Sequence, residues 1–148
     1  MFKYPLFLNR IMVLNIQITA AVGLLLSIYA YYVEIKTKKN SNYKALCDIT
    51  DGASCGKVVT SKYGKIVDGI SNSVGGILFY ISVLVLTLYN LPVFMTSLQA
   101  IFYLSVLSIL GSLYLAYIQY FKIKSLCVVC TAIYIVNILL VVFSYLKL

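Results

Sequence analysis

The sequence predicts an all-α integral membrane protein, a four-transmembrane-helix bundle with a long loop that caps it between the first and second helices. Two observations predict this fold class. Of its 148 residues, 62% are hydrophobic and only 11% are charged, which is too apolar for a soluble surface. The chain also contains four apolar stretches, and about 20 helical residues are enough to cross a hydrocarbon core about 30 Å thick. We therefore expect a single membrane domain over residues 1–148.

The four predicted helices cover about residues 11–33, 74–91, 93–121 and 126–146. The first stretch is longer than the roughly 7 to 15 apolar residues of a signal-peptide core, so we expect it to remain in the mature protein. Asn90-Leu91-Pro92 predicts a tight turn, with Pro92 at the start of the third helix. The connection before the fourth helix, residues 122–125, is also short.

The loop at residues 34–73 is the connection with enough residues to form a structured cap. It contains Cys47 and Cys55, whereas Cys127 and Cys130 form a CxxC pair at the start of the predicted fourth helix. With four spanning helices, this loop and the last connection emerge on the same side of the membrane. All four cysteines are therefore expected to converge at one face.

The CxxC pair predicts a redox centre. Residues three apart face the same side of a helix, so Cys127 and Cys130 can close a disulfide or open to a dithiol with little backbone movement. Ser125 is expected to cap this helix, which would put Cys127 in the first turn, where free amides and the helix dipole stabilise a thiolate. Tyr134 and Asn137 follow on the face of Cys130. Their hydrogen-bonding groups mark a place where a quinone head group could sit.

Several short elements accompany the cysteines in a specific order: Ala45-Leu46-Cys47-Asp48, Ser54-Cys55, Val58, Ser61, Tyr63-Gly64, Ser71-Asn72-Ser73, and the CxxC followed by Tyr134 and Asn137. In order and spacing they resemble the vitamin K epoxide reductase family. The likeness runs from about Leu46 to Asn137. It is that of a small, prokaryotic-type homologue without a fused thioredoxin-like domain.

The resemblance implies a membrane thiol:quinone oxidoreductase that supports disulfide bond formation. Its electrons would come from a separate thioredoxin-like protein, which exchanges thiols with Cys47. Cys55 would then pass the electrons to Cys127. Cys130 would face the quinone, a substrate such as ubiquinone or menaquinone.

The resemblance also implies the residues that hold this quinone. Asn72 and Tyr134 match the positions that hydrogen-bond the quinone carbonyls. Three further residues are candidates for a supporting role: Asp48, Ser61 and Asn137. The partners expected are thus a thiol protein, membrane lipid and membrane quinone, with no nucleic acid.

Two other functions stay open. The same bundle could run as a quinone or quinone-epoxide reductase on partner thiols, although Tyr63 stands where vertebrate members have a tryptophan. It could also be a non-enzymatic membrane scaffold whose cysteines are structural, with no bound quinone. No metal is expected, because seven residues separate Cys47 from Cys55 and the chain has no histidine, unlike the usual zinc-site spacing.

The basic residues bear on membrane orientation. Nine of the twelve Lys and Arg residues lie in the long loop or the last connection. The positive-inside rule then favours a cytoplasmic cysteine face, whereas the resemblance implies an extracytoplasmic one. The basic loop is also suited to lie against anionic lipid head groups.

Overall fold

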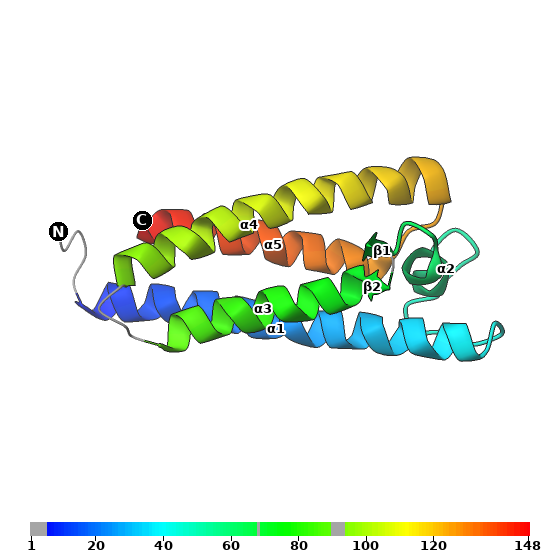
Figure 1. The fold of residues 1–148 in the computed structure, drawn as a ribbon, viewed down its shortest axis with the longest axis horizontal. Helices are drawn as coiled ribbons and strands as arrows, with labels where there is room; N and C mark the ends of the chain where they lie inside the picture. The colour runs from blue at the N-terminus through cyan, green and yellow to red at the C-terminus, as the bar shows by residue number, and fades with distance from the viewer. Residues whose placement is uncertain (1–5, 68, 90–93) are drawn as a thin grey trace.

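Four long helices form a bundle in the computed structural model, which describes residues 6–67, 69–89 and 94–148. They are α1 (Leu6–Lys39), α3 (Asn72–Leu88), α4 (Phe94–Tyr117) and α5 (Val128–Lys147), and a π-helical segment, η1 (Ile118–Ile123), continues α4. Helix α1 packs against both α3 and α5, and α5 packs against α4. The helices run alongside one another, and a small cap closes one end of the bundle (Figure 1).

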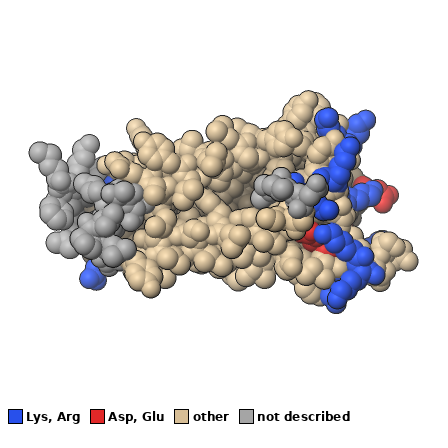
Figure 2. Space-filling view, viewed as in Figure 1, with Lys and Arg blue, Asp and Glu red and all other residues tan. Residues whose placement is uncertain are grey.

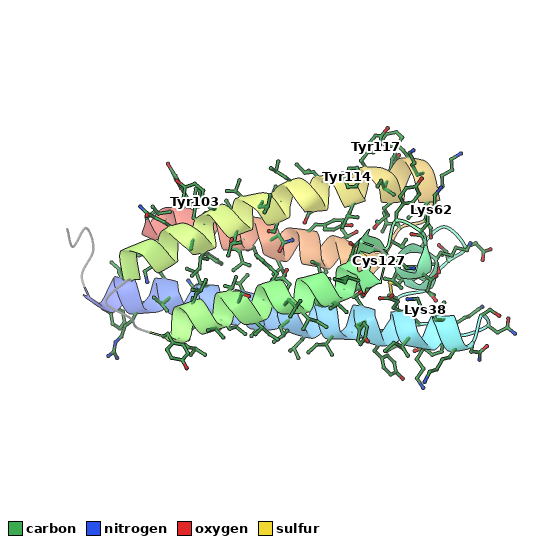
Figure 3. All side chains as sticks on the ribbon, viewed as in Figure 1. Lys38, Lys62, Tyr103, Tyr114, Tyr117 and Cys127 are labelled. Carbon is green, nitrogen blue, oxygen red and sulfur yellow. A yellow bond between two sulfur atoms is a disulfide. The ribbon has the colours of Figure 1, made fainter. Side chains whose placement is uncertain are left out.

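Within the described ranges, three segments are long and apolar enough to cross a membrane: Arg10–Lys39, Leu98–Ile123 and Val128–Lys147. Helix α3 is apolar but has only 17 residues, so a fourth crossing remains a prediction. The tyrosines Tyr103, Tyr114 and Tyr117 of α4 are exposed and point away from the bundle (Figure 3). Large apolar side chains cover its sides in the same way, as expected of a multi-pass membrane protein.

The helix ends differ from the predicted ones. Helix α1 extends to Lys39, so the first residues of the expected loop are helical. Glu34 and Lys38 form an ion pair at i,i+4 spacing, and the lysines of the last turn complement the helix dipole. These local interactions continue the helix past the apolar stretch from which its end was predicted. No proline or glycine interrupts it there.

The other boundaries shift by a few residues. Helix α3 starts at Asn72, because the Ser71 side chain accepts a hydrogen bond from the amide of Val74 and caps it. The predicted turn over residues 90–92, including the start of the third helix at Pro92, lies outside the described residues. The last two helical segments end at Ile123 and Lys147.

The cap is built from the loop between α1 and α3. It contains the short helix α2 (Cys55–Thr60) and an antiparallel hairpin of β1 (Lys65–Val67) and β2 (Ile70–Ser71). Gly69 has a φ of +102° in the hairpin turn, a conformation that glycine adopts at low cost. The hairpin is a small addition to an otherwise all-helical fold. Lys and Arg side chains gather at this end, and the middle of the bundle shows no charge on the face in Figure 2.

Among the residues that the structure describes, the buried hydrophobic side chains form two clusters, one at each half of the bundle. The cluster distant from the cap surrounds Tyr80, which is fully buried. Gly23 on α1 faces the Tyr80 ring, and a Cβ at Gly23 would overlap that ring. The cluster at the cap end joins α1, the cap and α5 around three of the cysteines: Ala30, Val33, Ala45, Cys47, Cys55, Val58, Val59, Cys127 and Val129.

Candidate redox site

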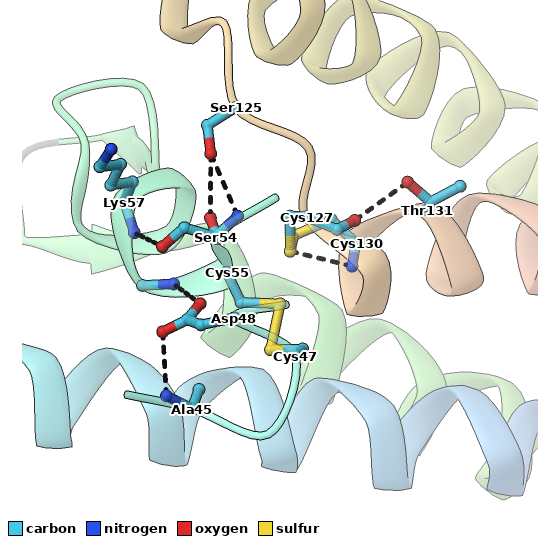
Figure 4. The surroundings of a disulfide bond; sticks show 11 residues. Ala45, Cys47, Asp48, Ser54, Cys55, Lys57, Ser125, Cys127, Cys130 and Thr131 are labelled. Carbon is cyan, nitrogen blue, oxygen red and sulfur yellow. Dashed lines mark hydrogen bonds between the residues drawn. A yellow bond between two sulfur atoms is a disulfide. The ribbon is translucent and has the colours of Figure 1, made fainter. Parts of the chain in front are cut away.

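Two disulfides lie at the cap end of the bundle. Cys47 is bonded to Cys55 with a Cα–Cα distance of 5.9 Å, and Cys127 is bonded to Cys130 with a Cα–Cα distance of 5.2 Å. Cys47, Cys55 and Cys127 belong to one buried cluster, and Cys130 packs against it. Figure 4 shows the two pairs facing each other across the junction of the cap and α5. The predicted convergence of the four cysteines is therefore present.

The outer pair, Cys47–Cys55, is held by Asp48. The Asp48 amide donates to the Ala45 carbonyl at 3.0 Å, and the Asp48 carboxylate accepts hydrogen bonds from the amides of Ala45 at 2.9 Å and Gly56 at 3.3 Å. Burial alone would raise the pKa of Asp48, but these amide hydrogen bonds, with one from Ser54, outweigh it and keep the pKa below its ordinary value. Asp48 thus ties together the two backbone segments that carry the outer disulfide.

The inner pair, Cys127–Cys130, begins helix α5. Cys127 is the N-cap residue, with extended backbone angles, and its Sγ accepts a hydrogen bond from the amide of Cys130 at 3.1 Å. The expected cap at Ser125 is therefore wrong, and Cys127 precedes the first turn instead of lying in it. Lys124 has a φ of +53°, which turns the chain so that the helix starts three residues after Ser125.

Ser125 instead fastens the cap to α5. Its Oγ accepts a hydrogen bond from the amide of Ser54 at 3.2 Å and lies 3.5 Å from the carbonyl of the same residue. The amide of Leu126 donates to the carbonyl of Gly52 at 2.9 Å. The segment just before Cys55 is thereby held against the segment just before Cys127 (Figure 4). This clasp, made of Gly52, Ser54, Ser125 and Leu126, was not apparent in the sequence.

A partly enclosed cavity of about 90 Å³ lies beneath the cap. Its lining includes Cys130 and Tyr134 from α5, Asn72 from α3, and Ser61 from the end of α2. Four residues that the sequence singled out thus border one space. The rest of its wall is mainly apolar, and Gly76 lets α3 approach Ser27 of α1 closely there.

Asn72 has a second role at this cavity. Its backbone amide donates to the carbonyl of Gly64 at 2.8 Å, and its side-chain Nδ2 donates to the carbonyl of Tyr63 at 3.0 Å. Asn72 therefore fixes the cap segment that forms the roof. Its Oδ1 and its second N–H are the groups left to address a ligand.

A wider groove of about 660 Å³ opens beside the cavity, between α3 and α4. Tyr63, Asn72 and Tyr134 border both spaces. The ammonium groups of Lys62 and Lys122 lie 5.0 and 5.9 Å from the centre of the Tyr63 ring, within cation–π range. Tyr63 therefore stands at the cationic end of an otherwise apolar groove.

Asn137 lines this groove but not the cavity. Its Oδ1 accepts a hydrogen bond from the Tyr80 hydroxyl at 2.7 Å, and its Nδ2 donates to Ser112 Oγ at 2.8 Å. Buried polar groups joined in this way tie α3, α4 and α5 together. Asn137 thus makes the interhelical contacts common for asparagine in membrane helices. The sequence did not single out Tyr80, because a tyrosine in an apolar helix looks like any packing aromatic.

Among the described residues, one group has the spacing of metal ligands: Cys47, Asp48 and Cys55, whose ligand atoms lie within 4.8 Å of one another. In the oxidised pair the two sulfurs are bonded to each other, so neither is the thiolate that a metal requires. The chemistry of the oxidised site is that of thiol–disulfide exchange.

Two adjacent disulfides at one end of a membrane bundle, one of them bordering a cavity, define a membrane-bound thiol–disulfide oxidoreductase. The family model described as "Vitamin K epoxide reductase family" matches residues 14–145. The chain is also 35% identical to "Vitamin K epoxide reductase complex subunit 1" of Mus musculus and of Rattus norvegicus, over 84% of this chain and 83% of each relative. The chain belongs to the vitamin K epoxide reductase family, and it is an enzyme of the oxidoreductase class.

Proposed function

We propose that this protein passes electrons from a thioredoxin-like thiol protein through its outer and inner disulfides to a membrane quinone. One observation carries the proposal. Cys130 borders the cavity with Tyr134 and Asn72, while its disulfide partner Cys127 belongs to the buried cluster that holds the outer pair. The inner pair thus lies next to the outer pair, from which electrons would arrive, and next to the cavity in which their acceptor would bind.

The first exchange takes place at the outer pair. A thiolate of the partner attacks Cys47, which forms a mixed disulfide and releases Cys55 as a thiolate. The second partner thiol then attacks the partner's own sulfur in this mixed disulfide. The partner leaves oxidised, and Cys47 and Cys55 are left as a dithiol that holds two electrons.

The second exchange moves these electrons inward. The Cys55 thiolate attacks Cys127 and releases Cys130 as a thiolate. Cys47 then attacks Cys55, so the outer disulfide closes again and the inner pair becomes the dithiol. The clasp between Ser54 and Ser125 supports this step, because it holds the two reacting segments side by side.

The last step reduces the quinone. The inner dithiol gives up two electrons and two protons, and the Cys127–Cys130 disulfide re-forms as the quinone becomes a quinol. Tyr134 and Asn72 would hydrogen-bond the two carbonyl oxygens on which negative charge develops. In the whole cycle, one partner dithiol and one quinone become one partner disulfide and one quinol.

A second candidate reaction is reduction of a quinone epoxide, favoured by the name of the mouse and rat relatives. The same inner dithiol would deliver two electrons and two protons, and the products would be the quinone and water. Both reactions use one cavity and one relay. They differ only in the acceptor.

The test is turnover by the purified protein in lipid nanodiscs, with a reduced thioredoxin as electron donor. Ubiquinone, menaquinone and vitamin K epoxide are offered separately as acceptors. We expect quinol formation that depends on all four cysteines. If no acceptor is reduced while the cysteines stay oxidised, the relay is refuted and the cysteines are structural.

A further inference from the structure

Two large apolar side chains are exposed on the cap, away from the membrane-spanning helices. Leu46 is 93% exposed and Ile49 is 69% exposed, and both lie between the end of α1 at Lys39 and the start of α2 at Cys55. Side chains facing lipid are expected to be apolar, but these two extend from the polar, basic end of the molecule. Exposed apolar residues grouped in such a place commonly mark a contact with another molecule.

The fold holds these side chains outward. Ala45 and Cys47, on either side of Leu46, are buried in the cap-end cluster. The two hydrogen bonds between Ala45 and Asp48 close the turn that carries Leu46. Ile49 follows directly and is fixed by a hydrogen bond from its amide to the carbonyl of Ala53 at 3.0 Å. Leu46 and Ile49 are therefore presented by a braced turn.

The same turn carries the cysteine at which electrons would enter. Cys47 is 7% exposed, whereas Cys55 and Cys127 are almost completely buried. A protein thiol that attacks Cys47 must bring its surface to within bonding distance of this turn. That surface then covers the neighbouring side chains, Leu46 and Ile49.

We propose that Leu46 and Ile49 form the docking surface for the thiol partner, which contacts them through an apolar face beside its reactive cysteine. This inference rests on the proposed function and adds the residues that recognise the partner. Insertion of the turn into lipid is disfavoured, because the adjacent groove of about 650 Å³ is polar and is lined by Asp48, Asp51 and Lys57.

The charge around this surface specifies the partner further. Lys44 and Lys57 are exposed on the same groove, and nine of the twelve basic residues of the chain lie in the cap, at the end of α1 or in the connection before α5. A partner with carboxylates around its apolar face would be attracted to it and associate faster at low salt. The apolar contact gives the affinity, and the lysines steer the approach.

The experiment compares the double variant Leu46→Ser/Ile49→Ser with the wild-type protein in nanodiscs, measuring quinone reduction with two electron donors. The donors are reduced thioredoxin, which must dock, and dithiothreitol, which is too small to need the surface. We expect the KM for thioredoxin to rise about tenfold or more, with turnover on dithiothreitol changed less than about twofold. Ile70→Ser is the matched control, because Ile70 is an exposed apolar residue of β2, elsewhere on the cap, and it should leave both donors unaffected.

Unchanged thioredoxin kinetics in the double variant would overturn the docking surface. An equal loss with both donors would also overturn it, because the turn would then be only structural. A separate measurement is independent of the quinone step. In a Cys55→Ala background, Cys47 is first converted to a mixed disulfide with thionitrobenzoate, and a reduced thioredoxin that lacks its second cysteine then attacks Cys47, which forms the Cys47–thioredoxin disulfide and releases thionitrobenzoate. If the wild-type protein reduces no quinone, the proposed function fails, and slower formation of this adduct with the double variant would still support the docking surface.

Discussion

The two disulfides meet at one buried cluster, which includes every cysteine but Cys130, yet they have different surroundings. The outer pair, Cys47–Cys55, joins a turn of the cap to the start of α2, where Asp48 binds both backbone segments and apolar side chains beside Cys47 are exposed. The inner pair, Cys127–Cys130, starts a membrane-spanning helix and borders a mainly apolar cavity. In the proposed relay, the outer pair meets a protein and the inner pair meets a lipid-soluble molecule.

This difference shows how the fold divides a two-electron transfer. A single disulfide would have to be accessible both to a protein in water and to a quinone in lipid. In the proposed relay each pair serves one of the two, and the clasp at Ser54 and Ser125 holds the segments that carry them together. Cys127, the sulfur that Cys55 would attack, is fully buried and so is kept away from bulk water.

The largest effect is expected when the inner pair is broken. Cys130→Ala should abolish quinone reduction, because Cys127 can no longer close a disulfide after the quinone step. The free Cys127 thiol should instead attack Cys55, and a Cys55–Cys127 disulfide should accumulate. Mass spectrometry of non-reduced digests identifies this bond, and Ile135→Ala on the exposed side of α5 is the control. A Cys47–Cys127 bond in its place would contradict the proposed order of the relay.

Chemical labelling tests the accessibility of the two pairs and the orientation of the protein. After mild reduction, a membrane-impermeant maleimide should label Cys47 before Cys127, since Cys127 is the more deeply buried. Nine of the twelve Lys and Arg residues lie at the end of the molecule that holds the cysteines, and they predict a cytoplasmic cysteine face, because each near-surface charge contributes on the order of 1 kcal/mol with anionic lipid. Intact cells should therefore show no labelling until the membrane is opened. Labelling in intact cells would show that the cysteine face is extracytoplasmic, and the proposed relay would be unaffected.

Tyr134→Phe is expected to have a moderate effect, which is confined to quinone reduction by the inner pair. The variant keeps the shape of the cavity wall but loses one hydrogen bond to the quinone, worth about 0.5 to 1.5 kcal/mol. Quinone turnover should fall by about twofold to tenfold, while reduction of the outer pair by thioredoxin stays unchanged. Stopped-flow measurement of the two half-reactions separates them. Tyr103→Phe, on the outside of α4, is the control, and equal kinetics in both variants would remove Tyr134 from the site.

The smallest effect is expected from Asp48→Asn, beside the outer pair, and it concerns the stability of the folded protein. Because folding lowers the pKa of Asp48, its charge contributes stability above its unfolded pKa of about 3.9, and this contribution is lost as the pH falls through the folded value. The free energy of unfolding of the variant at pH 7 should be lower than that of the wild type by about 1 kcal/mol, after screening by solvent. The difference from wild type should vanish in acid below the folded pKa. Thermal unfolding across this range is the measurement, and a difference independent of pH would show that the carboxylate charge is not its cause.

Much of the architecture could be predicted from the sequence, because apolar stretches and the spacing of cysteines are local signals. They located the long helices and brought the four cysteines to one end. The predictions were wrong where contacts between residues far apart in the sequence determine the local structure. Ser125 looks like a helix cap in the sequence, but its hydroxyl is engaged by Ser54, which lies 71 residues earlier. The extension of α1 depends on polar pairing that hydrophobicity does not register.

In the candidate site, too, local spacing predicted some features, and contacts between distant residues determined the others. Helical spacing correctly brought Cys130 and Tyr134 to one cavity, and the resemblance to the family added Asn72 and Ser61. Spacing alone placed Asn137 on the same face but could not give its depth. Seven residues along a helix is about 10 Å, which carries Asn137 past the cavity to Tyr80 and Ser112.

The clasp also has a consequence for how the protein is made. Gly52 and Ser54 leave the ribosome long before their partners, Leu126 and Ser125, have been synthesised. Until the final helix has entered the bilayer, the loop lacks the segment to which it hydrogen-bonds. Electrons at the outer pair then have no inner pair to receive them. The electron relay should therefore assemble only at the end of translation. A nascent chain arrested before residue 125 should carry a cap that proteases cut readily, whereas the full-length chain should resist them.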